Sequence, residues 1–353
     1  MKTTRITTLF VAGVLLAAPG FAQKKGARVQ LTPNEAQKKI EVSIDGKPFT
    51  AYFYPGPDVL KKPVLYPILT ANGTAITRGW PIDPRPGERV DHPHHVGMWF
   101  NYGDVNGHDF WNNSNNVQGH GGPFGTIVHT GVTSIKSGND QGELTVTADW
   151  LDKDNKPMLK EVTTFVFRGT GNERSIDRTT TLTALTKDVL FKDNKEGMIA
   201  IRVARQLEHP SNKPEVFTDA SGLATKVPSM DNTGVTGHYK SSEGVEGENV
   251  WGKRAKWMNL TGTINGENIS VAIFDHPQNV GYPTYWHSRG YGLYAANPLG
   301  AKVMSEGKDP AMNYTLPAGK SVTFRYRVVV TSNADSEKSM DKQAERFSAS
   351  RSQ

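Results

Sequence analysis

The sequence predicts an all-β protein, a large antiparallel β-sandwich. Segments in which apolar and polar residues alternate recur along the chain, glycine and proline fall between these segments, and long helical periodicity is nearly absent. A period of two is typical of strands that bury one face. Many such strands separated by turn residues favour a sandwich or a barrel. At 353 residues the chain is long enough to bury a large core.

Residues 1–22 are predicted to form a secretory signal peptide. Lys2 and Arg5 give a basic start, an apolar stretch follows, and Gly20 and Ala22 place small side chains before Gln23. The apolar stretch is too short to span a bilayer well, although an N-terminal membrane anchor is the alternative. We therefore expect a periplasmic or secreted bacterial protein, without membrane insertion after removal of the signal.

The amino-acid composition excludes several kinds of catalytic chemistry and several classes of partner. The chain has no cysteine, which excludes disulfides, zinc–thiolate sites and cysteine nucleophiles. The net charge of +6 is spread along the sequence and forms no basic stripe, so we expect no nucleic-acid partner. No serine-hydrolase elbow, phosphate-binding glycine loop or dinucleotide-binding motif is found. Serine-nucleophile and nicotinamide chemistry are therefore not expected.

The clearest strands come early in the mature chain. Ile40, Val42 and Ile44 alternate with polar residues, and Asp45-Gly46 then offers a tight hairpin turn. From Leu144 to Trp150 the apolar residues again share one face. The same pattern predicts further strands at 162–167, 199–203, 269–273 and 322–328.

These strands predict one sandwich domain over residues 23–335. Within it, residues 206–257 turn polar and glycine-rich, and we interpret them as a long excursion over one rim of the sheet. Residues 336–353 are predicted to be a charged C-terminal tail that begins with a short helix.

One segment, Asp91 to Trp111, concentrates residues that can carry chemistry. If it is extended, His92 and His94 point the same way and His95 points opposite. These imidazoles could transfer protons or bind a divalent metal, with His92 and His94 as ligands and His108 and Asp109 as further ones. The plain alternative is a hydrogen-bonded turn that holds the edge of the sheet.

Aromatic and amide side chains in the same segment suit a sugar. Trp99 and Trp111 could form a platform for a sugar ring, or they could simply pack in the core. Asp104 and Asn106, bracketed by glycines, could contact a ligand. The same turn could also be an ordinary hairpin or a weak calcium-type cluster of oxygens.

A second dense segment, Phe274 to Gly300, again joins aspartate, histidine and tryptophan. His276 and His287 are candidates for proton transfer, and Trp286 is a candidate for the sugar platform. Arg289 could bind a carboxylate or stabilise an anionic intermediate, unless it forms a surface ion pair. We expect the two segments to line one pocket, with His95 and His287 on its wall.

Three stretches together resemble the DUF6807 family, whose members are often labelled methane oxygenase PmoA or PmoA-like: "DHPHHVGMWFNYGDVNGHDFW", "FDHPQNVGYPTYWHSRGYGLYAANPLG" and "LPAGKSVTFRYRVVV". The resemblance extends from about Ile40 to Val330. More distantly the chain resembles supersandwich proteins of the galactose-mutarotase type, in which a histidine acts as acid and a glutamate as base. That resemblance implies a supersandwich fold, with His95 or His92 as the acid. The membrane methane monooxygenase subunit itself is not expected, because the chain lacks spanning helices beyond its signal.

We therefore expect an exported carbohydrate-active enzyme that cleaves or isomerises a sugar or glycoside. Its catalytic candidates are His92, His94, His95, His108, Asp109, His276 and His287. Its substrate-binding candidates are Trp99, Asp104, Asn106, Trp111, Trp286 and Arg289. A divalent metal is a possible cofactor. The alternatives are a carbohydrate-binding protein without catalysis and a metal-dependent oxidase.

Overall fold

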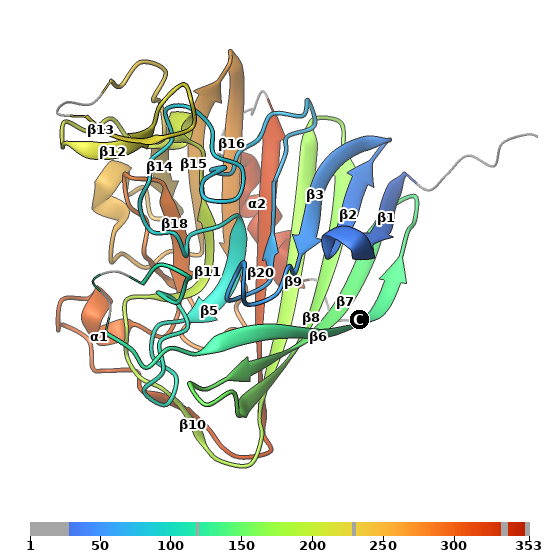
Figure 1. Ribbon diagram of the computed structural model, residues 1–353, viewed down its shortest axis with the longest axis vertical. Helices are drawn as coiled ribbons and strands as arrows, with labels where there is room; N and C mark the ends of the chain where they lie inside the picture. Colours follow the sequence, from blue (N-terminus) through green and yellow to red (C-terminus); the bar gives the residue numbers. More distant parts are fainter. Residues whose placement is uncertain (1–27, 118, 120, 228–230, 333–337, 350–353) are drawn as a thin grey trace, which may run out of the picture.

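The computed structural model describes residues 28–117, 119, 121–227, 231–332 and 338–349, and shows two large β-sheets packed face to face (Figure 1). The predicted signal peptide, residues 1–22, lies outside the described residues. In the described part of the chain each large sheet has eight strands, and all their pairings are antiparallel. The prediction of an antiparallel β-sandwich is confirmed.

The first sheet, called sheet I here, carries the candidate site. Its strands in spatial order are β1 (Val29–Asn34), β2 (Lys39–Ile44), β3 (Lys47–Phe53), β4 (Val64–Leu65), β5 (Met98–Tyr102), β11 (Gly197–Arg202), β18 (Leu293–Asn297) and β17 (Tyr285–Trp286).

The second sheet, called sheet II, supplies most of the opposing core face. Its strands in spatial order are β14 (His238–Ser241), β15 (Trp257–Ile264), β16 (Glu267–Asp275), β20 (Ser321–Ser332), β9 (Glu173–Ala184), β8 (Pro157–Thr170), β7 (Gly142–Leu151) and β6 (Thr126–Lys136).

The alternating segments form the strands that their patterns predict. Ile40, Val42 and Ile44 are buried in β2, and Asp45 and Gly46 take positive φ angles in the turn to β3. Such angles are required of a two-residue hairpin turn whose twist matches the flanking strands. In β7 every second residue from Gly142 to Trp150 is buried, so one face of this strand lies in the core.

The strand at 269–273 differs from its prediction in one respect. The pattern predicts one wet face, but Ile269–Asp275 of β16 is buried throughout. The reason is helix α2 (Lys338–Ala349), whose Met340 and Phe347 pack on the outer side of sheet II. The predicted tail therefore contains an amphipathic helix that closes an otherwise exposed apolar face.

The long polar stretch holds several short elements. These are η2 (Arg205–Leu207), the hairpin β12 (Glu215–Thr218) and β13 (Ala224–Val227), strand β14, and η3 (Gly247–Val250). Strand β14 pairs with β15 and so extends sheet II. Outside the large sheets lie also η1 (Glu35–Gln37), the pair β10 (Val189–Phe191) and β19 (Tyr314–Leu316), and α1 (Ala301–Met304). None of the described helices is long and apolar enough to span a bilayer.

Candidate functional site

The outer face of sheet I, turned away from sheet II, carries a second and smaller apolar cluster. Met98 and Phe100 of β5 point into the main core, so Trp99 between them points outward. Trp99 lies opposite Ala200, and Ala200 lies opposite Ala295 on the next strand. These two small side chains leave space above the strands that aromatic rings fill.

The histidine-rich segment reaches this face as a turn. The backbone N–H of His95 donates to the carbonyl of His92 at 2.9 Å, and His92 has a φ of 44°. The segment is therefore not extended, and the arrangement with His92 and His94 on one side and His95 on the other does not arise. A residue other than glycine rarely takes such a φ, and residues held in this way cluster at functional sites.

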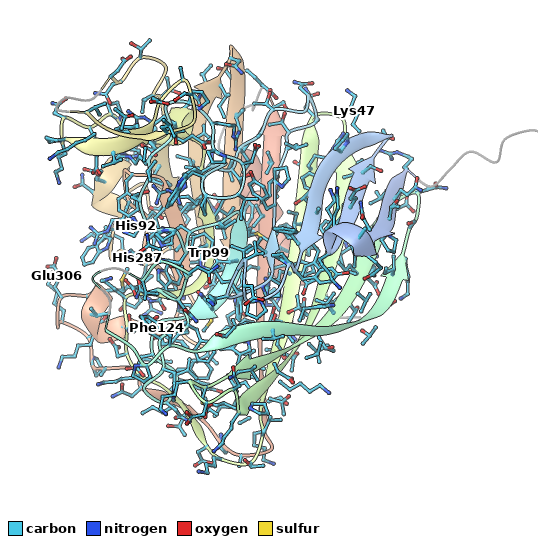
Figure 2. All side chains as sticks on the ribbon, in the orientation of Figure 1. Lys47, His92, Trp99, Phe124, His287 and Glu306 are labelled. Atoms are coloured by element: carbon cyan, nitrogen blue, oxygen red, sulfur yellow. The ribbon has the colours of Figure 1, made fainter. Side chains whose placement is uncertain are left out.

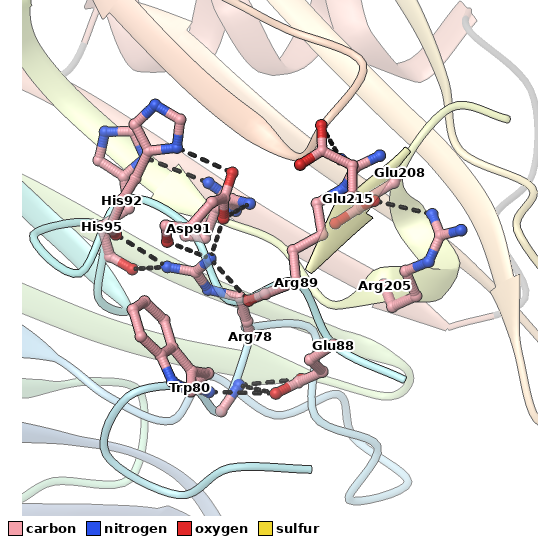
Figure 3. A network of polar contacts seen from close by, with 12 residues as sticks. Arg78, Trp80, Glu88, Arg89, Asp91, His92, His95, Arg205, Glu208 and Glu215 are labelled. Carbon is pink, nitrogen blue, oxygen red and sulfur yellow. Dashed lines mark hydrogen bonds and ion pairs between the residues drawn. The ribbon is translucent and has the colours of Figure 1, made fainter. Parts of the chain in front are cut away.

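A buried arginine holds the turn in place. The guanidinium of Arg78 donates to the carbonyl oxygens of Arg89 at 3.2 Å, Asp91 at 2.8 Å, and His92 and His95 at 3.0 Å each (Figure 3). Arg78 is 1% exposed, so these charge-assisted bonds form away from bulk water. They fix the backbone from which the histidine side chains project.

Asp91 connects two buried arginines to His92. Its Oδ1 accepts from Arg78 Nη1 at 2.5 Å and from Arg202 Nη2 at 2.6 Å, and its Oδ2 accepts from His92 Nδ1 at 2.8 Å (Figure 3). Burial opposes ionisation of Asp91, but the two arginines and the His92 bond outweigh it and hold its pKa well below the usual range. The carboxylate is therefore charged.

The charged carboxylate decides which nitrogen of His92 is available for chemistry. An ionised carboxylate only accepts hydrogen bonds, so Nδ1 of His92 carries the proton in this contact. In the neutral ring, Nε2 then holds the free lone pair. The His92 side chain is 37% exposed, which leaves that nitrogen within reach of a ligand.

Four aromatic rings, one of them that of His92, stack in a column. Tyr291 and His92 are 5.0 Å apart and nearly parallel, His92 and His95 are 4.8 Å apart, and His95 and Trp99 are 5.0 Å apart. Trp111 meets His95 edge-on at 5.6 Å. The column restricts rotation of the His92 ring.

Two of the candidate histidines are held neutral. Burial, then the nearby charges of His94, His92 and the arginines, lower the pKa of His95 well below its ordinary value. Arg202 Nη1 lies 3.3 Å from His95 Nδ1, so the proton of His95 sits on Nε2. Burial, then Lys195 and Arg289, lower the pKa of His287 to about 3. Both rings are therefore uncharged at neutral pH.

These groups border a pocket of about 370 Å³ on the outer face of sheet I. Figure 2 shows His92 and His287 next to each other there, with Trp99 on the inner side. The polar and aromatic residues that line the pocket are His92, His95, Trp111, Asn112, Lys195, Glu196, Lys213, Glu248, His287, Arg289 and Tyr291. The two dense segments of the sequence thus meet at one pocket.

Glu196 lines the pocket but is not among the residues predicted from the sequence. Its Oε2 accepts from Asn112 Nδ2 at 2.6 Å, and its Oε1 pairs with Lys195. Asp109 lies behind Asn112 and accepts from the backbone N–H groups of Trp111 at 2.8 Å and Asn112 at 2.9 Å. Asp109 therefore positions pocket residues and does not itself line the pocket.

His94 and Trp99 lie beneath the pocket wall. The His94 ring meets His95 edge-on at 4.4 Å, and its carbonyl accepts from Lys62 Nζ at 2.7 Å. Burial lowers the pKa of Lys62 to about 7. Trp99 is 0% exposed, so it supports the ring column from below.

Asp104, Asn106 and His108 form a hairpin away from the pocket. The N–H of Gly107 donates to Asp104 Oδ1 at 2.9 Å, and Asn106 Oδ1 accepts from the N–H of Leu190 at 2.8 Å. His108 Nδ1 lies 3.2 Å from the carbonyl of Asn106. These bonds hold the turn against β10, which matches the hairpin alternative.

His276 and Trp286 also lie away from the pocket. The His276 ring meets Phe347 of α2 edge-on at 5.0 Å, on the outer side of sheet II. Trp286 belongs to the main core between the sheets, and its Nε1 donates to the carbonyl of Ala255 at 3.1 Å. Among the described residues, no group of three or more histidine, aspartate or glutamate side chains is arranged to hold a metal ion.

A second cavity of about 420 Å³ lies beside the β12–β13 hairpin. Its lining residues include Arg85, Glu88, Arg205 and Phe217, none of which is a candidate from the sequence. Arg205 lines this cavity and, like Arg89, forms an ion pair with Glu208 (Figure 3).

Residues 39–345 match the model of DUF6807, described as a family of unknown function. The chain belongs to the DUF6807 family. The prediction of family membership is thus confirmed over most of the sequence. No curated protein matches this DUF6807 chain.

Solved structures show similarity at low sequence identity. A putative aldose 1-epimerase from Escherichia coli K12 is 9% identical with a TM-score of 0.37, over 87% of this DUF6807 chain and 100% of that protein. A galactose mutarotase-like protein from Clostridium acetobutylicum is 12% identical with a TM-score of 0.39, over 87% and 99%. The galactosidase domain of an α-galactosidase–sucrose kinase is 9% identical with a TM-score of 0.40. That match covers 89% of this chain and 43% of the other.

Proposed function

We propose that this DUF6807 protein is a carbohydrate-active enzyme that cleaves or isomerises a sugar or glycoside in the pocket on sheet I. The Asp91–His92 pair carries this proposal. Asp91 orients the His92 ring and stabilises the imidazolium that forms when Nε2 takes a proton, as the carboxylate does in hydrolase triads. His92 is then the general base, and its exposed edge faces the pocket.

The rest of the pocket supports a sugar as ligand. Tyr291 contributes an aromatic ring to the wall, the buried Trp111 supports the wall beneath His287, and Asn112, Glu196 and His287 offer hydrogen-bonding groups. A volume of about 370 Å³ falls in the range of small-molecule sites, which combine apolar walls with a few placed polar groups.

Glu196 is the second proton-transfer group in this proposal. In hydrolysis, His92 takes a proton from water as the water oxygen bonds to the anomeric carbon, the bond to the departing oxygen breaks, and that oxygen takes a proton from the Lys195–Glu196 pair. In isomerisation, the same two groups remove and return a proton on the sugar. Asn112 and Lys195 hold the Glu196 carboxylate in place for either reaction.

A substrate screen with paired histidine variants tests the proposal. The full-length protein is incubated with reducing sugars and with glycosides, and NMR follows anomeric exchange and product release. Turnover is expected in the wild type and in His238→Gln, an exposed histidine outside the pocket, and is expected to be lost in His92→Gln. Equal turnover in both variants contradicts the role of His92. Saturable sugar binding without turnover instead supports the alternative of a non-catalytic carbohydrate-binding protein.

A further inference from the structure

The pocket wall carries three cationic side chains, Lys195, Lys213 and Arg289. They come from three distant parts of the chain, and the fold gathers them at one opening. A pocket for a neutral sugar needs hydrogen-bond donors and acceptors, but it does not need this collection of positive charge.

The acidic residues at the pocket leave part of this charge uncompensated. Lys195 is paired with Glu196. Within the described residues Arg289 and Lys213 form no ion pair, and Glu248, packed close to the backbone of Gly290, is the only other carboxylate on the wall. Behind the wall, Arg78 and Arg202 share the single charge of Asp91, and Asp109 behind Asn112 adds one more negative charge. The pocket region therefore has an excess of positive charge.

Arg289 is held in a way that leaves its donors available. Its guanidinium lies 4.6 Å above the Trp251 ring, and its backbone N–H donates to the carbonyl of Leu293 at 2.8 Å. Stacking fixes the plane of a guanidinium without using its N–H groups. The lowered pKa of His287, to which Arg289 and Lys195 contribute after burial, agrees with a positive field inside the pocket.

We infer that the ligand of this pocket carries a carboxylate, so that the substrate class is a hexuronic acid or a hexuronide. The inference rests on the proposed function for the sugar part of the ligand. Arg289 binds the carboxylate through two parallel hydrogen bonds, the geometry for which a guanidinium is suited, and Lys213 adds charge from the rim. The sugar ring then faces His92 and Glu196.

Calorimetric titration with matched sugars tests this inference. Glucuronate is compared with glucose, and galacturonate with galactose, at low and high salt. The wild type is expected to bind each hexuronate at least about tenfold more tightly than its hexose, a difference of about 1.4 kcal/mol that shrinks with salt.

Two arginine variants show whether the preference comes from this pocket. Arg289→Gln is expected to remove most of the hexuronate preference. Arg254→Gln is the matched control, since Arg254 also stacks on an aromatic ring, Tyr285 at 5.2 Å, but does not line the pocket. Equal binding of hexuronate and hexose, or an undiminished preference in Arg289→Gln, overturns the inference and leaves the proposed function standing. Binding of none of the four sugars overturns both.

Discussion

The tripeptide Asp-His-Pro occurs twice in this chain, and its two copies have opposite environments. His92 lines a pocket, and two arginines keep its partner Asp91 charged. Asp275 and His276 are both buried, and His276 packs against Phe347 of helix α2. There, burial raises the pKa of Asp275 to about 7, although Asn279 and the N–H of Thr284 donate to its carboxyl. The comparison shows that the partners supplied by the fold, and not the local motif, decide whether the aspartate of such a pair is charged.

The largest expected difference between the copies is in stability. Asp91→Asn leaves Arg78 and Arg202 without a counter-charge in a buried site, and we expect the free energy of unfolding to fall by about 3–5 kcal/mol. Asp275→Asn removes a carboxyl that accepts two hydrogen bonds and should cost about 1–3 kcal/mol. Urea unfolding of both variants measures the difference, and equal losses would show that the arginines do not depend on Asp91.

The next largest difference is expected in turnover, which should depend on His92 and not on His276. Once a substrate is known, His92→Gln is expected to lower kcat by about 10²–10⁴-fold, because it removes the base. His276→Gln lies outside the pocket and should leave kcat unchanged. A loss of similar size in both variants contradicts the assignment of chemistry to the first copy alone.

The two aspartates should also change stability with pH in opposite directions. The folded-state pKa of Asp275 lies above its unfolded value of 3.8, so the native state binds the extra proton and stability falls as pH rises from 4 to 7. The pKa of Asp91 is lowered on folding, so its contribution is present above pH 4 and is lost on acidification below it.

Urea midpoints measured between pH 4 and 7 test the Asp275 side of this opposition. Asp275→Asn should remove a slope of up to about 1.4 kcal/mol per pH unit relative to the wild type, while other titrating groups contribute equally to both proteins. Asp154→Asn, an exposed surface change, is the control. An unchanged slope in Asp275→Asn would mean that the buried carboxyl is already ionised at acid pH.

The smallest expected effect concerns the packing of His276, in the second Asp-His-Pro copy. His276→Ala removes the edge-on contact with Phe347 and should lower the free energy of unfolding by about 0.5–1.5 kcal/mol. Hydrogen exchange should show the loss in α2 and not at the pocket. Faster exchange around residues 91–95 in this variant would link two regions that the structure separates.

The sequence alone predicts the fold class and the meeting of its two dense segments. Period-two alternation is a local property, so strands such as β2 and β7 follow from their own residues. The second region of the site, with His287 and Arg289, could also be predicted, because histidine and arginine next to tryptophan in a loop are conspicuous.

The remaining pocket residues depend on contacts that no local pattern encodes. Glu196 and Lys213 reach the site from parts of the chain without histidine or tryptophan clusters. The segment around His92 is not extended, because the guanidinium of Arg78 donates to carbonyl oxygens of loop residues that lie 13 to 17 positions later in the sequence. Arg202 could have been predicted, since an arginine inside an apolar run of sequence needs a buried anion as partner when it is buried.

Along each central strand of sheet I, alternate residues point into the core and the residues between them point toward the pocket side. Trp99, between Met98 and Phe100, is an example. A single-residue insertion or deletion in β5, β11 or β18 would exchange these two sets from that point on. In evolution, new ligand preferences in this family should therefore arise by point substitution on these strands, with length changes confined to the loops that connect them.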